Sequence, residues 1–155
     1  MMRAPDQILA AIEAQLASVA GSNGVHRKPL FLLDAADLDC IVIDDITDEL
    51  VADVGYFPRT ETHTLSFDVI PLVMATAETC LAQLGDLHLA VEQALFGSLT
   101  AIRLGGLLNR PLKNPSTAFF SDTETLQQPV CGWRLRVSCT YHTRSDQPGL
   151  IDKES

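Results

Sequence analysis

The residues from Gly132 to Tyr141 alternate between apolar and polar side chains without a break. One side of an extended chain carries the apolar set, Trp133, Leu135, Val137, Cys139 and Tyr141. The other side carries Arg134, Arg136, Ser138 and Thr140. A period of two predicts a strand with one face on a core and the other face polar. The stretch from His63 to Val69 repeats this pattern, so the chain is expected to contain a sheet with one apolar and one polar face.

Two segments have helical periodicity instead. Apolar residues recur at spacings of three and four from Pro5 to Val19 and again from Ala75 to Phe96. The combination predicts one α+β domain over residues 1–144, in which an antiparallel or mixed β-sheet carries two main helices packed on one face. Residues 145–155 are polar and include Pro148 and Gly149, so we expect a flexible tail there.

The remaining elements are shorter. Besides a long strand from His63 to Met74, the strand candidates are Leu30–Leu33, Cys40–Ile43 and Ala118–Leu126. The segment from Ile46 to Thr62 is polar and contains Gly55 and Pro58, which predicts a loop. The pair Gly105–Gly106 predicts a tight turn with positive φ.

Composition limits the function classes. The chain has 20 acidic and 11 basic side chains, for a net charge of −9, and shows no cluster of Lys or Arg. This balance argues against recognition of nucleic acid, which depends on neutralising phosphates. The N-terminus has no apolar signal segment and no stretch approaches the roughly 20 apolar residues of a membrane span, so we expect a cytoplasmic protein. The widely spaced Cys40, Cys80, Cys131 and Cys139 are then expected to be reduced core residues.

The sequence offers no catalytic constellation. The four histidines, His26, His63, His88 and His142, stand at no zinc-ligand spacing from one another or from cysteine. There is no nucleophile elbow, and Leu104–Leu107 lacks both the Lys-Ser/Thr of a phosphate-binding loop and the full dinucleotide-binding spacing. We therefore expect no enzyme, no catalytic residue, no metal and no cofactor.

Charge is concentrated at two places. Eight carboxylates lie between residues 34 and 53: Asp34, Asp37, Asp39, Asp44, Asp45, Asp48, Glu49 and Asp53. They form a solvated rim, a docking surface that steers a basic partner, or a cation site, although the EF-hand spacing is not met. Arg134 and Arg136 project from the polar side of the last strand and are either solvated or paired with the acidic stretch of a neighbouring subunit. The candidate protein-binding residues are thus Asp34, Asp37, Asp39, Asp44, Asp45, Arg134 and Arg136.

Three stretches together resemble the tail terminator proteins of long-tailed phages, the minor tail protein U type. Residues 27–31 and 37–43 look like that family's early strand pair, although the usual Pro-Ala before the second strand is absent. Thr62–Leu72 looks like its long strand, and Cys131–Tyr141, with its Gly-Trp and final Tyr, looks like its closing strand. The similarity spans roughly Pro5 to Thr143 and consists of element order and a few residue types.

The resemblance implies a structural virion protein of a phage or prophage. Such a protein forms a homohexameric ring that caps the tail tube, stops its polymerisation and meets the head-completion proteins. The family supplies no catalytic residues and no motif-bound contact residues to transfer. Two other functions fit the same residues. One is another neck, tail-completion or injection-system connector, and the other is a stand-alone acidic inhibitor or immunity-type protein.

Overall fold

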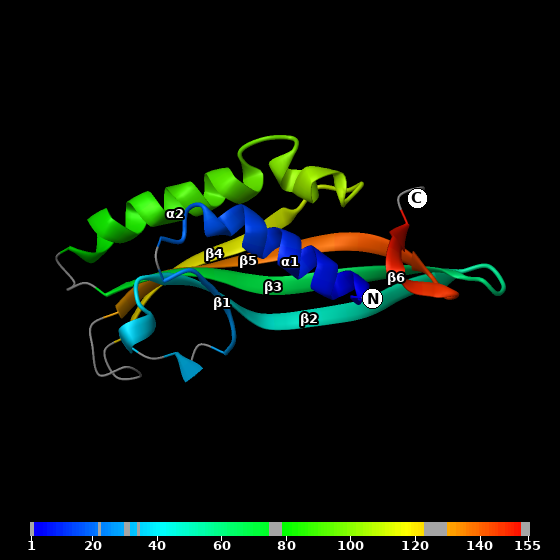
Figure 1. The fold of residues 1–155 in the computed structure, drawn as a ribbon, viewed down its shortest axis with the longest axis horizontal. Helices are drawn as coiled ribbons and strands as arrows, with labels where there is room; N and C mark the ends of the chain where they lie inside the picture. Colours follow the sequence, from blue (N-terminus) through cyan, green and yellow to red (C-terminus); the bar gives the residue numbers. More distant parts are fainter. Residues whose placement is uncertain are drawn as a thin grey trace.

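The computed structural model describes residues 2–21, 23–29, 32–33, 35–74, 79–122 and 130–152. Six strands form one sheet in the order β1-β2-β3-β5-β4, with β6 paired to β5 (Figure 1). Strand β1 is parallel to β2 and every other pair is antiparallel, so the expected α+β class with a mixed sheet is confirmed. The strands are β1 Val25–Arg27, β2 Cys40–Val54, β3 Thr60–Met74, β4 Lys113–Asp122, β5 Val130–Arg144 and β6 Gln147–Asp152.

The helices contribute side chains to the main core. They are α1, Ala4–Ala17, and α2, Cys80–Phe96, with two short 3-10 helices, η2 at Ala35–Asp37 and η3 at Ala101–Gly106. Apolar side chains of α1 and α2 join one cluster with side chains of β2, β3 and β5, including Phe67 and Val137. A second cluster around Val42 and Ile70 lies apart from the helices. The positive φ expected at Gly105 and Gly106 is confirmed, at 67° and 96°.

The alternation in β5 is confirmed with one exception. Leu135, Val137, Cys139 and Tyr141 are buried, as the apolar phase predicts. The apolar phase also predicts that Trp133 is the largest core residue. In the structure, Trp133 is only half-buried. It lies at the border between the main core and a small third cluster, against the rings of His88 and Phe119. The largest side chain in the fully buried set is Phe67.

The predicted loop from Ile46 to Thr62 is wrong. Strand β2 continues to Val54 and β3 begins at Thr60, so only a short turn separates them. Register shifts fall between Asp44 and Thr47 and between Leu50 and Ala52. Each such bulge exchanges the two faces of the strand and erases the period of two. Because every residue from 45 to 59 is exposed, no apolar stripe marks this half of the hairpin either.

Other boundaries also differ. The expected flexible tail forms β6, in which Ile151 is buried, while Gln7 of α1 donates a hydrogen bond to the Gly149 carbonyl. Of the strand expected at Leu30–Leu33, Leu32 and Leu33 belong to no strand, and residues 30 and 31 lie outside the described residues. The strand expected at Ala118–Leu126 is β4, which starts earlier, and residues 123–126 lie outside the description. Helix α2 is described from Cys80, since residues 75–78 are not described.

The cysteines are not all reduced. The structure joins Cys80, at the start of α2, to Cys131 of β5 in a disulfide, with Cα atoms 6.3 Å apart. Cys40 and Cys139 are free and buried, and burial raises the pKa of each thiol to about 12. The bonded residues are 51 positions apart in sequence, and only the packing of α2 on the sheet brings them together.

Candidate interaction surfaces

The β2–β3 hairpin extends past α1 and α2 to one end of the molecule (Figure 1). Leu50, Val51 and Val54 are more than half exposed on its outer half, and the turn carries Tyr56 and Phe57 at 95% and 78% exposure. We call residues 45–59 the distal hairpin. An apolar group of this size on a projecting element is typical of a surface that contacts another molecule.

The structure divides the acidic candidates. Asp34 lies outside the described residues. Asp37 pairs with Lys28 at 3.3 Å, and the Asp39 carboxylate accepts a hydrogen bond from the Met74 backbone at 2.8 Å. Asp37 therefore links η2 to the residue after β1, and Asp39 links the residue before β2 to the end of β3. Asp44 and Asp45 lie farther along, at the first bulge of β2, where Asp45 has a φ of 51°.

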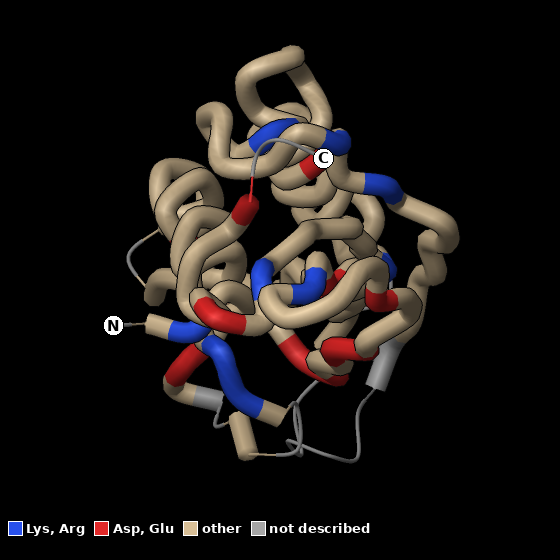
Figure 2. Tube along the Cα trace, turned by 90° about the vertical axis from the view of Figure 1, so that its right-hand side faces the viewer, with Lys and Arg blue, Asp and Glu red and all other residues tan. Residues whose placement is uncertain are grey.

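The sequence-predicted acidic set is therefore not one surface. Asp48, Glu49 and Asp53 follow on the distal hairpin, and they form with Asp45 the acidic part of β2. Figure 2, which views the molecule from the end that Figure 1 has on its right, shows acidic segments concentrated in the lower half of the view. Basic segments lie at the top, at the right, near the centre and at the lower left, where they adjoin acidic ones.

Arg134 and Arg136 lie together on the polar side of β5, as the alternation predicts, and their partners belong to their own chain. Arg134 Nη1 donates to the Asp68 carboxylate at 2.7 Å, and Arg136 Nη1 donates to the other oxygen of Asp68 at 3.2 Å. Arg136 also reaches Asp45 at 3.1 Å. Asp68 is only 3% exposed. Both arginines are thus paired within their own chain, and Arg136 reaches the acidic stretch at Asp45, so neither is simply solvated. Pairing with the acidic stretch of a neighbouring subunit stays a prediction.

A basic region that sequence reasoning missed leads into β4. Residues 93–121 contain Arg103, Arg110 and Lys113 and no acidic residue. Arg103 is in η3 and Lys113 begins β4. Within the described part of the chain, neither Arg103 nor Lys113 forms an ion pair. A count of charge by segment could have found this region, because residues 34–53 show the reverse imbalance.

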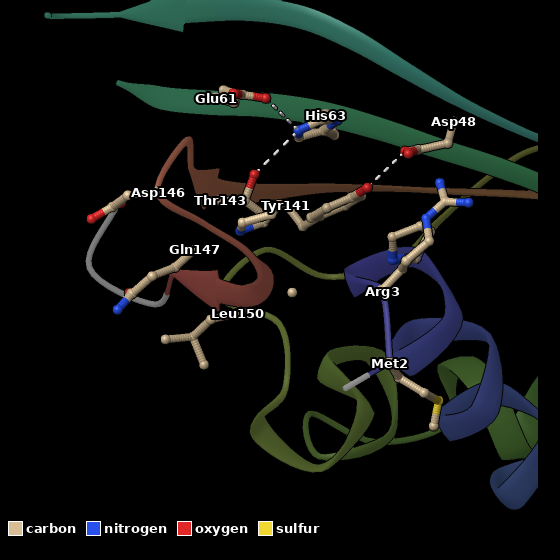
Figure 3. Close-up of a pocket in the computed structure, with 13 residues that line it drawn as sticks. Met2, Arg3, Asp48, Glu61, His63, Tyr141, Thr143, Asp146, Gln147 and Leu150 are labelled. Carbon is tan, nitrogen blue, oxygen red and sulfur yellow. Dashed lines mark hydrogen bonds and ion pairs between the residues drawn. The ribbon is translucent and has the colours of Figure 1, made fainter. Parts of the chain in front are cut away.

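An open pocket of about 560 Å³ lies between the start of α1, the β2–β3–β5 part of the sheet and β6 (Figure 3). The Tyr141 hydroxyl donates to Asp48 at 2.8 Å, and the Tyr141 ring stacks on His63 with centroids 5.0 Å apart. Burial, with the bond to Asp48, raises the pKa of Tyr141, so the phenol stays protonated. Thr143 Oγ1 and a Glu61 oxygen lie 3.2 and 3.4 Å from the same nitrogen, Nε2 of His63.

The polar groups of the pocket do not form a catalytic relay. A nucleophile–histidine–carboxylate relay places the hydroxyl and the carboxylate on opposite ring nitrogens. Here the Thr143 hydroxyl and Glu61 approach one nitrogen of His63, and Asp48 accepts a hydrogen bond from the Tyr141 hydroxyl. These contacts link β5 to β2 through Tyr141 and Asp48, and β5 to β3 through Thr143 and His63, next to the distal hairpin.

Three further observations concern possible ligands and relatives. In the part of the chain that the structure describes, no group of three or more His, Cys, Asp or Glu is placed to hold a metal ion. None of the described helices is long and apolar enough to cross a membrane. Neither a family model nor a curated protein matches the chain.

Proposed function

We propose that the protein is a non-catalytic structural subunit that assembles head to tail into a ring. In this role it is the tail terminator of a long-tailed phage or prophage, built in the host cytoplasm, and it joins the tail tube to the head-completion proteins. The observation that carries the assembly is the opposite charge at the two edges of one sheet. The acidic part of β2 lies at one edge, and β4, which begins with Lys113 and follows a segment with Arg103 and Arg110, lies at the other.

Two different edges favour a ring over a twofold dimer. Contacts between unlike surfaces are head to tail, and they close into a ring when the rotation between copies permits. The resemblance to tail terminators supplies the expected number of six subunits and the partners at the two ring faces. In this arrangement both main helices pack on one face of the sheet, which leaves the face with Arg134 and Arg136 for other contacts.

Light scattering across a concentration series at low and high salt tests the assembly. We expect a mass above the monomer that falls as salt rises, because each exposed ion pair contributes roughly 0–1 kcal/mol and salt screens it. Binding to purified tail tubes tests the position in the virion. A protein that stays monomeric at every concentration and ignores tail tubes would remove the terminator proposal.

The exposed carboxylates of the distal hairpin favour a second candidate function. An acidic inhibitor or immunity-type protein would dock this hairpin on a basic target as a monomer or dimer. The scattering experiment separates the two, since only the ring subunit is expected to form a larger assembly. A neck or other tail-completion connector would form the same ring and differ in the end of the tube that it binds.

A further inference from the structure

We infer that neighbouring copies join by antiparallel strand pairing between the outer edge of β2 in one copy and the outer edge of β4 in the next. This interface rests on the proposed function and names the surface that closes the ring. The segments that meet are Thr47–Leu50 and Thr117–Phe120. Both are regular parts of their strands, since no register shift falls inside either one.

Both edges lack a strand partner within the described residues. Strand β1 covers β2 only at residues 41–43, so the rest of β2 pairs on one side alone, with β3. Strand β4 pairs with β5 and ends the sheet. Residues 45–54 of β2 and 113–119 of β4 are all exposed. Such edges are templates for another strand, and closing the sheet on itself removes them.

The distribution of charge favours a second copy of this chain, in this orientation, as the partner of the β2 edge. The acidic part of β2 repels another β2 edge, which disfavours a twofold β2–β2 contact. The β4 edge begins with Lys113 and follows a segment that holds Arg103, Arg110 and no acidic residue. In an antiparallel pair, Lys113 at the start of β4 lies toward the end of β2 that holds Glu49 and Asp53. The Asp53 carboxylate also pairs with Arg59 of its own hairpin at 2.9 Å. The difference in charge therefore favours pairing of β2 with β4 over pairing of β2 with another β2.

Strand direction agrees with a ring. The chain of antiparallel pairs from β2 through β3 and β5 to β4 makes β2 and β4 run in opposite directions. A rotated copy that keeps the same sheet face inward thus presents its β4 antiparallel to β2. The two segments also present the same sheet face. Glu49 is opposite Thr64, which pairs with Thr140 of β5. Ala118 is opposite Arg134 of β5. Thr140 and Arg134 belong to the same polar side of β5, so Glu49 and Ala118 share a face.

Cysteine cross-linking tests the pairing. In one chain, Glu49 and Ala118 stand on opposite edges, at least three strand spacings or about 14 Å apart, which is too far for an internal disulfide. We expect Glu49→Cys and Ala118→Cys proteins, mixed and mildly oxidised, to give a covalent dimer on a non-reducing gel, while each alone stays monomeric on the gel. Pairing Glu49→Cys with Thr117→Cys is the matched control, since Thr117 is on the other face and its yield should be at least several-fold lower. Both sites are exposed, and urea unfolding verifies that each variant folds.

The outcomes separate the interface from the function. A protein that forms a larger assembly by light scattering but gives no 49–118 cross-link overturns this interface and leaves the ring proposal standing. Cross-linking of Glu49→Cys with itself overturns the head-to-tail contact in favour of a twofold one. A chain that is monomeric throughout overturns both proposals.

Discussion

At the scale of single residues, the polar side of the sheet is organised by Asp68. Its buried carboxylate accepts hydrogen bonds from Arg134 and Arg136, and Arg136 then holds Asp45 at the first bulge of β2. Opposite charges on adjacent strands stabilise a sheet when their partners stay in place. A buried charge left without its partner costs far more than a surface pair gains.

Replacing Asp68 should therefore destabilise the fold much more than replacing Asp45. We expect Asp68→Asn to lower the free energy of unfolding by about 2 kcal/mol, since it weakens two charge-assisted hydrogen bonds at a buried site while both arginines keep access to water. The control Asp45→Asn removes an exposed partner and should cost less than about 1 kcal/mol. Urea unfolding measures both values, and equal losses would show that the burial of Asp68 has no energetic consequence.

His142 should make stability depend on pH. Burial lowers its pKa from the ordinary 6.5, Arg110 and His63 lower it further, and Asp152 opposes them. The folded chain then binds this proton less readily than the unfolded chain, so the stabilisation is complete above about pH 6.5 and is lost as the pH falls through the lowered value. Thr62 Oγ1 lies 3.0 Å from Nδ1 of His142, a contact that His142→Asn can keep.

Comparison with the His142→Asn variant separates the effect of His142 protonation on stability from that of the many carboxylates, which are present in both proteins. We expect unfolding free energies, measured in urea at several pH values between about 7.5 and 5, to fall more steeply for the natural protein than for His142→Asn. Parallel curves for the two proteins would contradict the assignment to His142.

At the scale of elements, the disulfide joins α2 to β5 beside the half-buried Trp133. In the chain-entropy model, closing a loop of 51 residues stabilises the fold by roughly 4 kcal/mol. Disulfides are rare in reducing cytosol, whereas the proposed function places assembly in the host cytoplasm. The oxidation state of this pair is thus informative about where the protein folds.

Alkylation and reduction test the bond directly. We expect the unfolded, unreduced protein to label at Cys40 and Cys139 only, and to label at all four cysteines after reduction. Reduction should also lower the urea midpoint, whereas a Cys80→Ala/Cys131→Ala double variant should be insensitive to reductant. Four labelled cysteines without reduction would show that the pair is not bonded.

At the scale of the whole molecule, the residues that stabilise the fold differ from the residues that are exposed for contact with another molecule. The main core is formed by side chains of α1 and α2 with side chains of β2, β3 and β5, while the distal hairpin exposes its apolar side chains at the end of the molecule. The net charge of −9 favours solubility over non-specific association. Specific association then depends on the surfaces where charge and exposed apolar area coincide.

A variant in the turn of the distal hairpin should affect association but not stability. We expect the double substitution Tyr56→Ser/Phe57→Ser to change the free energy of unfolding by less than about 1 kcal/mol, because both rings are largely exposed. The same variant should weaken any self-association or tail-tube binding seen by light scattering and sedimentation. A large loss of stability would mean that the two rings pack on the fold, and unchanged association would exclude the tip as a contact.

Local periodicity alone determined α1, the alternating His63–Val69 part of β3 and the buried phase of β5 from Leu135 to Tyr141, because in each an apolar stripe faces one core. Only tertiary structure decided the rest. The outer half of β2 could not be recognised from the sequence, because two bulges interrupt its alternation and its residues are exposed. Strand β6 is held by its pairing with β5 and by the hydrogen bond from Gln7 of α1. The Cys80–Cys131 bond and the sharing of Asp68 by two arginines join residues more than 50 positions apart. Such contacts depend on how strands are ordered in the sheet, and a one-dimensional pattern contains no information on that order.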